Sequence, residues 1–250
     1  MFKKIAAQSA AKSVVMGTII TTLCASSTLA HGSFFRSGFL AGAQLGASFG
    51  SGKFNTTLNI NPALPNNTFP ASGSVRKSAM LFGILCGYRH IFNQDYTIGF
   101  NLEANFFANN QLNKQFGYGN NPTAMINNNL KKSFNVIPSV VLGKIFCGRW
   151  HASLSLGLAI ARFRQQFSTD ANLDSLSGSA SKTKIGFIPA LGVEYATTPN
   201  VSLFGNISYE IYSKVSNTFK LNIPAINPVS YKTSISPKYL AFKVGAVYRF

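Results

Sequence analysis

The stretch LAFKVGAVYRF, residues 240–250, decides the fold class of this chain. One alternate set of its side chains is apolar or aromatic, namely Leu240, Phe242, Val244, Ala246, Tyr248 and Phe250. Lys243 and Arg249 belong to the other set, which also holds Gly245 and Val247. Because successive side chains of a strand point to opposite faces, one face is continuously apolar while the charges share the other. This pattern predicts a β-strand with lipid on one side.

The first 30 residues have the pattern of a cleavable signal peptide. Three lysines, Lys3, Lys4 and Lys12, precede an apolar run over residues 13–24, and small residues follow up to Ala30. We expect cleavage after Ala30, with residues 31–250 forming a single barrel domain. The run is too short for a spanning helix, which needs about 20 apolar residues. The alternative interpretation is a retained amphipathic anchor or a transit peptide.

The composition excludes an α-helical membrane protein. Hydrophobic residues make up 46% of the chain and charged residues 12%, yet no later segment is an apolar run of transmembrane-helix length. Alternating segments recur instead. We predict strands at residues 36–50, 77–91, 95–108, 133–146, 150–165, 183–196, 200–214 and 238–250.

The connections between these segments are short and long in turn. Short ones, rich in turn-forming residues, lie at 93–95, 148–149 and 198–200, and long polar ones lie at 51–76, 109–132, 166–182 and 215–237. Short periplasmic turns and long outer loops are typical of outer-membrane barrels. The sequence therefore predicts an all-β fold, an eight-stranded antiparallel transmembrane β-barrel with short periplasmic turns and four long outer loops.

Alternation alone does not separate a membrane barrel from a soluble one, but the aromatic residues do. Seven aromatic residues fall beside the short turns: Tyr88, Phe92, Phe146, Trp150, Tyr195, Tyr248 and Phe250. Their recurrence at one end of successive hairpins indicates an aromatic girdle at a membrane interface. Pro138 and Pro189 fall inside predicted strands, where a proline is tolerated mainly at a bulge or an edge.

The segments LFGILCGYRHIF (81–92), IPALGVEYA (188–196) and VGAVYRF (244–250) carry a family resemblance. With the signal pattern and the hairpin rhythm, the chain resembles the small OmpA-like or Omp25-like outer-membrane barrels and surface antigens of Gram-negative bacteria, over residues 31–250. The resemblance implies a location in the bacterial outer membrane and insertion by the barrel-assembly machinery. It further implies that Tyr248 and Phe250 form the assembly signal that this machinery recognises.

Charged residues in the inward phase of the strands predict a network in the lumen. Its members are Arg89, Glu103, Glu194, Glu210, Lys214, Lys243 and Arg249. Buried charges must be paired, so we expect a structural plug of ion pairs. A path for protons or ions through the lumen is the alternative.

The net charge of +17 is concentrated near the long loops. The expected basic rim consists of Lys53, Arg76, Lys77, Lys131, Lys132, Arg162, Arg164, Lys182, Lys184, Lys214 and Lys238. Within it, Arg162, Arg164, Lys182 and Lys184 are the expected contacts to lipopolysaccharide phosphates, because Lys and Arg pair with phosphate oxygens. The alternative is a solvated rim that limits aggregation. Nucleic-acid binding is not expected, because no recognised motif accompanies the charge.

Catalysis is not expected. The best candidate, Trp150-His151-Ala152-Ser153, has the His-x-Ser spacing of outer-membrane lipid A deacylases, but no acid follows until Glu194. The sequence shows no metal-ligand cluster or cofactor motif. We expect a monomer with a structural or surface-interaction role, adhesin-like or antigen-like, that meets an extracellular or host ligand through its outer loops. The alternatives are a narrow porin-like channel and, more remotely, a lipid A-modifying enzyme.

Overall fold

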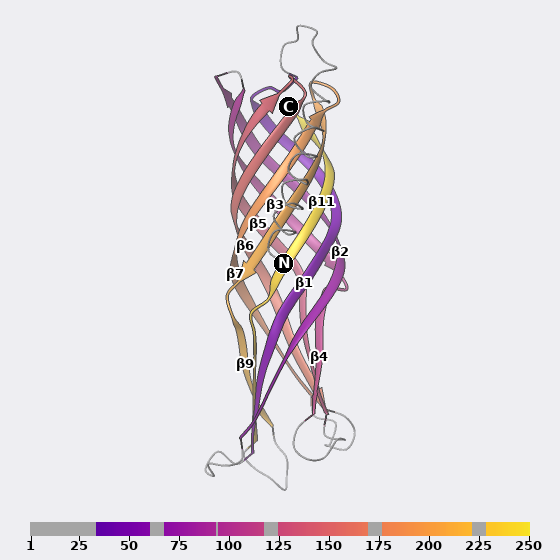
Figure 1. The fold of residues 1–250 in the computed structure, drawn as a ribbon, viewed down its shortest axis with the longest axis vertical. Coiled ribbons are helices and arrows are strands. Elements are labelled where there is room, and N and C mark those ends of the chain that lie inside the picture. Colours follow the sequence, from indigo (N-terminus) through magenta and orange to yellow (C-terminus); the bar gives the residue numbers. More distant parts are fainter. Residues whose placement is uncertain (1–33, 61–67, 94, 118–124, 170–176, 222–228) are drawn as a thin grey trace, which may run out of the picture.

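The computed structural model describes residues 34–60, 68–93, 95–117, 125–169, 177–221 and 229–250. Most of these residues lie in antiparallel strands that together form a long cylinder (Figure 1). The described part of the chain contains no helix with the length and apolar character needed to cross a membrane. The predicted signal peptide, residues 1–30, lies outside the described residues.

Eight strands close into a ring. They are β1 (Gly38–Ile60), β2 (Thr68–Phe92), β3 (Tyr96–Ala108), β5 (Met125–Phe146), β6 (Trp150–Thr169), β7 (Ser177–Ala196), β8 (Val201–Tyr212) and β11 (Lys238–Arg249). Each strand pairs antiparallel with the next, and β11 pairs with β1 from Leu40–Arg249 to Ser51–Lys238, which closes the ring. The predicted all-β fold with eight ring strands is confirmed.

The wall of the ring is apolar outside and polar inside, as the alternation predicts. Outward side chains such as Phe100, Leu158 and Leu191 are exposed, and the inward neighbours Thr97 and Glu194 are buried. A soluble barrel would bury the apolar set instead. A continuous exposed band of this kind is what a lipid environment requires.

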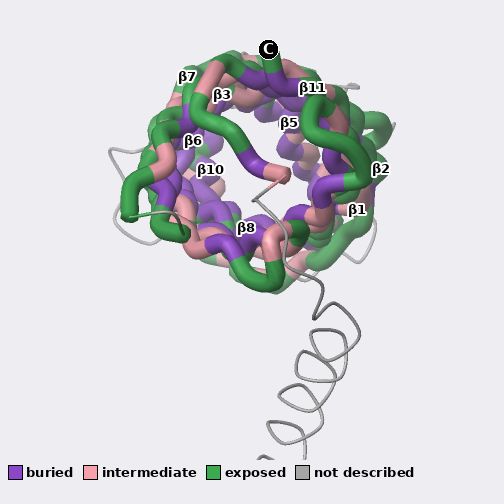
Figure 2. Tube along the Cα trace, turned by 90° about the horizontal axis from the view of Figure 1, so that it is seen from above, coloured by how far each residue is buried: buried purple, intermediate pink, exposed green. Residues whose placement is uncertain are grey.

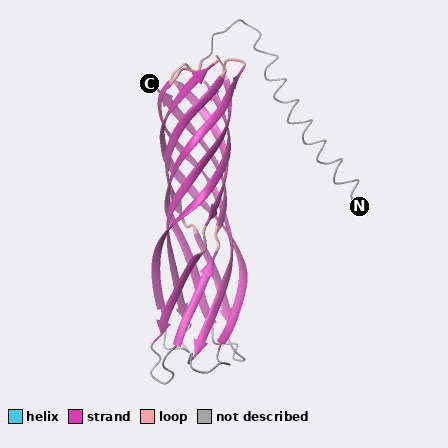
Figure 3. Cartoon of the chain, turned by 90° about the vertical axis from the view of Figure 1, so that its left-hand side faces the viewer, coloured by secondary structure: helices cyan, strands magenta, loops and turns pink. Residues whose placement is uncertain are grey.

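The four long connections contain more strand than the sequence predicts. Residues 51–60 continue β1, and residues 68–76, 125–132, 166–169 and 177–182 belong to β2, β5, β6 and β7. Three further strands are new: β4 (Gln111–Gly117), β9 (Val215–Leu221) and β10 (Val229–Ile235). These segments are therefore corrected from loop to strand, and together they form an extension beyond the ring, in the lower half of the cylinder in Figures 1 and 3.

The extension consists of two sheets that face each other. One sheet contains β9, β10 and the outer parts of β1 and β2, and the other contains β4 and the outer parts of β5, β6 and β7. No ladder of hydrogen bonds joins β2 to β4 or β7 to β9 within the described residues. The ring is thus closed by backbone pairing, whereas the extension has two seams.

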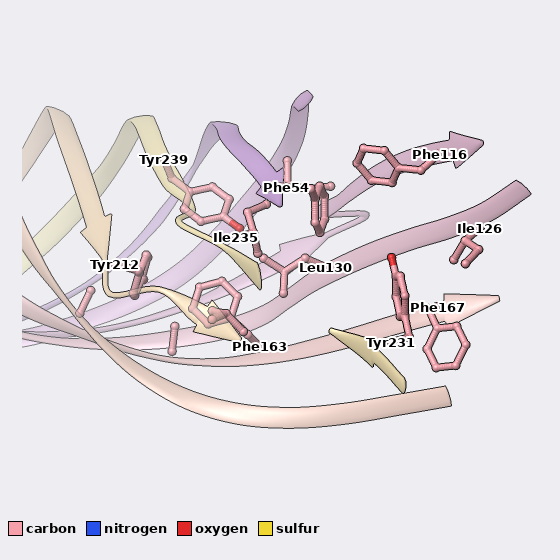
Figure 4. Close-up of a cluster of buried hydrophobic side chains, with 14 of the residues drawn as sticks. Phe54, Phe116, Ile126, Leu130, Phe163, Phe167, Tyr212, Tyr231, Ile235 and Tyr239 are labelled. Atoms are coloured by element: carbon pink, nitrogen blue, oxygen red, sulfur yellow. The ribbon is translucent and has the colours of Figure 1, made fainter. Parts of the chain in front are cut away.

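Aromatic and aliphatic side chains fill most of the space between the two sheets. Among them, Gln165 of β6 accepts a hydrogen bond from Asn217 of β9 at 2.6 Å and donates one to Thr233 of β10 at 3.1 Å. Phe54 of β1 meets Phe116 of β4 with ring centroids 6.4 Å apart, and Phe167 of β6 meets Tyr231 of β10 at 5.3 Å. Figure 4 shows this cluster, in which Leu130 and other aliphatic side chains lie among the rings. This buried core holds the sheets of the extension together.

Where the ring meets the extension, the apolar side chains change from the outer face of the strands to the inner face. On β6, the outward residues Leu158 and Ile160 are exposed and apolar, whereas the outward residues Arg162 and Arg164 are charged. Toward the same point the inward side chains become apolar, first the small Ala159 and Ala161 and then the large Phe163, all fully buried. Each strand can therefore have an apolar exterior within the ring and an apolar interior within the extension.

Interruptions in strand pairing explain how the two prolines are accommodated. Between β5 and β6 the recorded pairs pass from Val136–Ile160 to Ser139–Gly157, and Pro138 lies in the gap. Between β7 and β8 they pass from Phe187–Ile211 to Ala190–Ser208, and Pro189 lies in that gap. A proline cannot donate a ladder hydrogen bond, so it fits where the ladder is already interrupted.

Tight turns and aromatic side chains mark the other end of the ring, called the turn end below. Asn93, Cys147 and Gly148 have positive φ angles of 47°, 51° and 66°, which tight reversals of this kind use. Contacts between aromatic side chains, such as Trp150 and Tyr195 with ring centroids 4.8 Å apart, lie at this end. The chain ahead of β1 bends into the mouth of the ring here (Figure 2).

Candidate functional site: interior charge clusters and an outer basic rim

A charge cluster lies inside the ring near the turn end. Glu194 of β7 accepts hydrogen bonds from Arg89 of β2, at 2.7 Å, and from Arg249 of β11. Arg249 also donates to the hydroxyl of Ser202 at 2.7 Å. His151 lies beside them, with its Nδ1 3.6 Å from Glu194 Oε2. One carboxylate from β7 thus balances two buried guanidinium groups, one from β2 and one from β11.

The segment before β1 covers this cluster from the turn end. Phe35 is buried and packs with Ile145 and Ala196, and its ring lies 4.4 Å from the guanidinium carbon of Arg249. The backbone N–H of Phe34 donates to the carbonyl of Gly148 at 2.9 Å, which anchors the segment to a turn. The chain itself therefore covers the charge cluster at the mouth of the ring.

A second cluster lies deeper in the ring. Lys243 of β11 is 2.5 Å from Glu103 of β3, and Gln44 of β1 donates to Glu103 at 3.0 Å and to Asn105 at 2.6 Å. A cavity of ≈ 60 Å³, lined by residues of both clusters, separates Glu103 from Glu194. A cavity of that size has room for a few water molecules, at about 15 Å³ each, and not for a larger solute.

The third cluster lies where the ring meets the extension. Lys132 of β5 is 2.7 Å from Glu210 of β8, which also accepts hydrogen bonds from Tyr212 at 2.6 Å and Asn135 at 3.2 Å. The ammonium of Lys132 lies 3.7 Å from the ring centroid of Tyr239, so it interacts with an aromatic face as well.

A bulge in β5 creates this arrangement. The pairing of β5 with β6 shifts between Lys132 and Asn135, so both side chains point inward although their numbers differ by an odd count. As a result both reach the two oxygens of Glu210. Beyond this cluster the aromatic core of the extension begins.

The structure brings six of the seven predicted lumen residues into these clusters. Lys214 is the exception, because it is exposed between β8 and β9. Lys132 was predicted on the basic rim and is instead completely buried. The predicted network does not include His151, although the sequence places it in the same inward phase as Ser153 and Ser155.

The four predicted lipopolysaccharide contacts do not share one face. Arg162 and Arg164 of β6 are exposed and point outward. Lys182 and Lys184 pair with Phe163 and Ala161, which point inward. Lys182 donates across the seam to the carbonyl of Ser216, at the start of β9. The cation that faces outward beside Arg164 is its direct cross-strand partner Lys131. Lipid binding at this rim stays a prediction.

His151 forms the nearest approach to a catalytic arrangement. Its Nε2 lies 2.8 Å from the hydroxyl of Thr97, and Glu194 is its cross-strand partner. The hydroxyl of Ser153, by contrast, contacts the carbonyl of Gly192 at 3.5 Å. The described residues hold no group of three or more histidine, cysteine or acidic side chains that would suit a metal ion.

The predicted assembly signal is exposed at the turn end. Phe250 is 75% exposed and Tyr248 49%, and their rings meet edge to face with centroids 5.0 Å apart. The backbone N–H of Phe250 donates to the carbonyl of Phe39 at 3.0 Å, which extends the closing β11–β1 pair to the last residue.

Comparisons with known proteins agree with this architecture. The family model described as "Outer membrane protein beta-barrel domain" matches residues 16–250. The chain is similar to the outer membrane protease OmpT from Escherichia coli, with a TM-score of 0.50 and 10% identity, covering 85% of this chain and 97% of that one. At that identity the likeness concerns the fold alone.

Two further solved structures are similar over most of their length. For the outer membrane protein OprG from Pseudomonas aeruginosa the TM-score is 0.49 and the identity 14%, with coverage of 86% of this chain and 97% of that one. For Neisserial surface protein A the TM-score is 0.36 and the identity 16%, with coverage of 82% and 97%. A search of the curated proteins found no match.

Proposed function

Because the chain belongs to the outer membrane protein β-barrel domain family, we propose that it is a surface-interaction protein whose closed ring holds a rigid extension outside the bilayer. The length of the strands carries this proposal. β1 has 23 residues and β2 has 25, whereas about 9–11 residues suffice to cross a bilayer. The remainder forms the extension, whose exposed side chains are mostly polar and whose interior holds the buried aromatic cluster.

The filled interior favours this role over that of a channel. The segment with Phe35 covers the turn end, the three charge clusters occupy the ring, and buried aromatic side chains such as Phe163 and Tyr239 fill the extension. A conducting lumen needs a continuous polar path, which a small eight-stranded barrel with a filled interior does not offer.

The geometry of His151 also favours a non-enzymatic role. The carboxylate of Glu194 is held by two arginines, and its distance of 3.6 Å from His151 Nδ1 exceeds a hydrogen bond. The imidazole is buried inside the ring, where Phe35 covers it. A lipid substrate in the outer leaflet would have no access to the Thr97 hydroxyl or to this base.

Display on a bacterial surface tests the proposed function. Cells that carry the protein should adhere to host-cell and matrix-coated surfaces more strongly than cells with an empty vector. Replacing residues 61–67, 118–124, 170–176 and 222–228 with Gly-Ser segments of equal length should remove the gain, because these segments join the outermost strands. Equal adhesion of all three strains would contradict the proposal.

The purified protein should show no conductance in planar bilayers, and a steady conductance would favour the channel.

Deletion of Phe250 tests the proposed assembly signal. We expect less folded, heat-modifiable barrel in the outer membrane, because the deletion removes both an exposed aromatic ring and the last hydrogen bond to β1. The control is Phe92→Ala, which removes a 42% exposed aromatic ring elsewhere at the turn end. Quantitative gel-shift analysis of outer-membrane fractions measures both. Equal yields from the deletion and the parent would remove the support for a recognition signal.

A further inference from the structure

A row of polar and basic side chains crosses three neighbouring strands on the outer wall. Ser51 of β1 pairs with Arg76 of β2 on one side and with Lys238 of β11 on the other, so all three side chains point to the same face. Arg76 and Lys238 are exposed. Their Cα atoms are two strand spacings apart, roughly 10 Å, so both long side chains can converge above the Ser51 hydroxyl.

The next rows toward the ring are almost entirely apolar. Phe49 pairs with Leu240 and Ser78, and beyond them Ala47 pairs with Phe242 and Met80. An open surface groove of ≈ 560 Å³ runs across this boundary and is lined by Phe49 and Leu240 as well as by Ser51, Arg76 and Lys77. Lys238 does not line it but lies beside it, as the cross-strand partner of Ser51. The volume of the groove is within the range of ordinary ligand pockets. The groove therefore has an apolar side and a cationic side.

The distance to the turn end places this row at the edge of the hydrocarbon layer. Ten residues of β11 separate Lys238 from Tyr248 in the aromatic girdle. At about 3.3 Å per residue and a tilt of about 40°, this corresponds to a height of about 25 Å, the height of the apolar band of a transmembrane barrel. Lys238 and Arg76 thus lie where lipid headgroups begin.

Within the part of the chain that the structure describes, these cations have no acidic partner on the surface. Of the carboxylates in the described residues, Glu103, Glu194 and Glu210 lie inside the ring and Asp95 lies in a turn at the opposite end. Lys53, two residues further out on β1 and on the same face as Ser51, adds a further positive charge. No carboxylate of the described residues therefore balances these charges, and an anion from outside the chain can do so.

We infer that the groove on β11, β1 and β2 binds a phosphate-bearing lipid of the outer leaflet, such as lipid A. Arg76 can hold the phosphate through two parallel N–H donors, Lys238 supplies a second charge, and the Ser51 hydroxyl donates between them. An acyl chain lies along Phe49 and Leu240 and continues over the apolar rows below. The inference rests on the membrane placement of the family and is independent of the proposed surface-interaction role.

The test compares two double variants with equal loss of charge. Arg76→Gln with Lys238→Gln removes the site, whereas Lys220→Gln with Lys232→Gln removes two exposed lysines from β9 and β10 in the extension. Each protein is folded into phosphatidylcholine nanodiscs, and bound lipid A is titrated and counted by native mass spectrometry. The site variant should bind lipid A about tenfold more weakly or worse, because two charge-assisted hydrogen bonds are lost. The control should bind like the parent.

A charge-preserving variant and a free anion complete the design. Arg76→Lys with Lys238→Arg should bind lipid A within a few-fold of the parent, which separates loss of the site from damage to the fold. Inorganic phosphate added to lipid A-containing discs should displace little lipid, because it makes no contact with Phe49 or Leu240. Equal weakening in both double variants would show a bulk charge effect and overturn the site. Full displacement by phosphate would show a free-anion site and would equally overturn a lipid site.

Discussion

The Glu194→Gln variant is expected to lose about 3 kcal/mol or more of its free energy of unfolding, because two buried guanidinium groups would lose their shared counter-charge. Arg89 and Arg249 are both buried, and Glu194 is the carboxylate that contacts each of them. Glutamine keeps the size of the side chain, and its amide oxygen still accepts hydrogen bonds, but it carries no charge. The loss therefore measures electrostatics rather than packing.

Urea unfolding in detergent or lipid, followed by the heat-modifiable gel shift, measures this loss. Asp95→Asn is the matched control, since it neutralises an exposed acid at the same end of the molecule, and a change within about 0.5 kcal/mol is expected for it. A loss of less than about 1 kcal/mol in Glu194→Gln would mean that water screens the charges of the cluster.

The Lys132→Met variant should be destabilised by about 3–5 kcal/mol, since Glu210 would be left as a buried charge without its cation. Lys132 is completely buried, and its ammonium also interacts with the rings of Tyr239 and Phe107. Methionine fills most of the space but cannot neutralise the carboxylate. The same unfolding measurement gives the result.

The neighbouring residue supplies the control. Lys131→Met is the same substitution one position away. Lys131, however, points outward opposite Arg164, and the structure shows no buried acidic partner for it among the described residues. Removing one of two like charges that face each other across strands should have little effect or stabilise slightly. Adding Glu210→Gln to Lys132→Met should recover much of the loss. Equal destabilisation by Lys131→Met and Lys132→Met would contradict the assignment of Lys132 to the interior.

The eight ring strands could be predicted because lipid imposes a one-sided pattern. Residues such as Leu154, Leu156 and Leu158 must face outward. Their alternation with small or polar residues can be recognised in the sequence of one strand, without knowing its neighbours. The same rule places Glu103 and Lys243 inside. Their partnership across the ring depends on the register, which the sequence alone does not provide.

The extension was missed because its pattern is the reverse of the ring's. In β4 Leu112 and Phe116 point inward and are buried, whereas in the ring strands the apolar set points outward, and Lys114 between them interrupts the apolar alternation. The strand lies among asparagines that favour turns, so local composition indicated a loop. Lys132 was misplaced for a related reason, because the bulge before Asn135 changes the parity of inward positions on β5.

The two seams of the extension have a mechanical consequence. Backbone pairing runs around the whole ring, whereas side-chain packing alone joins β2 to β4, and a single side-chain hydrogen bond from Lys182 adds to the packing between β7 and β9 within the described residues. Local opening should therefore begin at the seams and leave the ring intact, as in a protein with sub-global folding units. A ligand that spans a seam would bind the closed form more tightly than the open one and so would clamp the two sheets together. Recognition outside the cell would then be coupled to the rigidity of the extension.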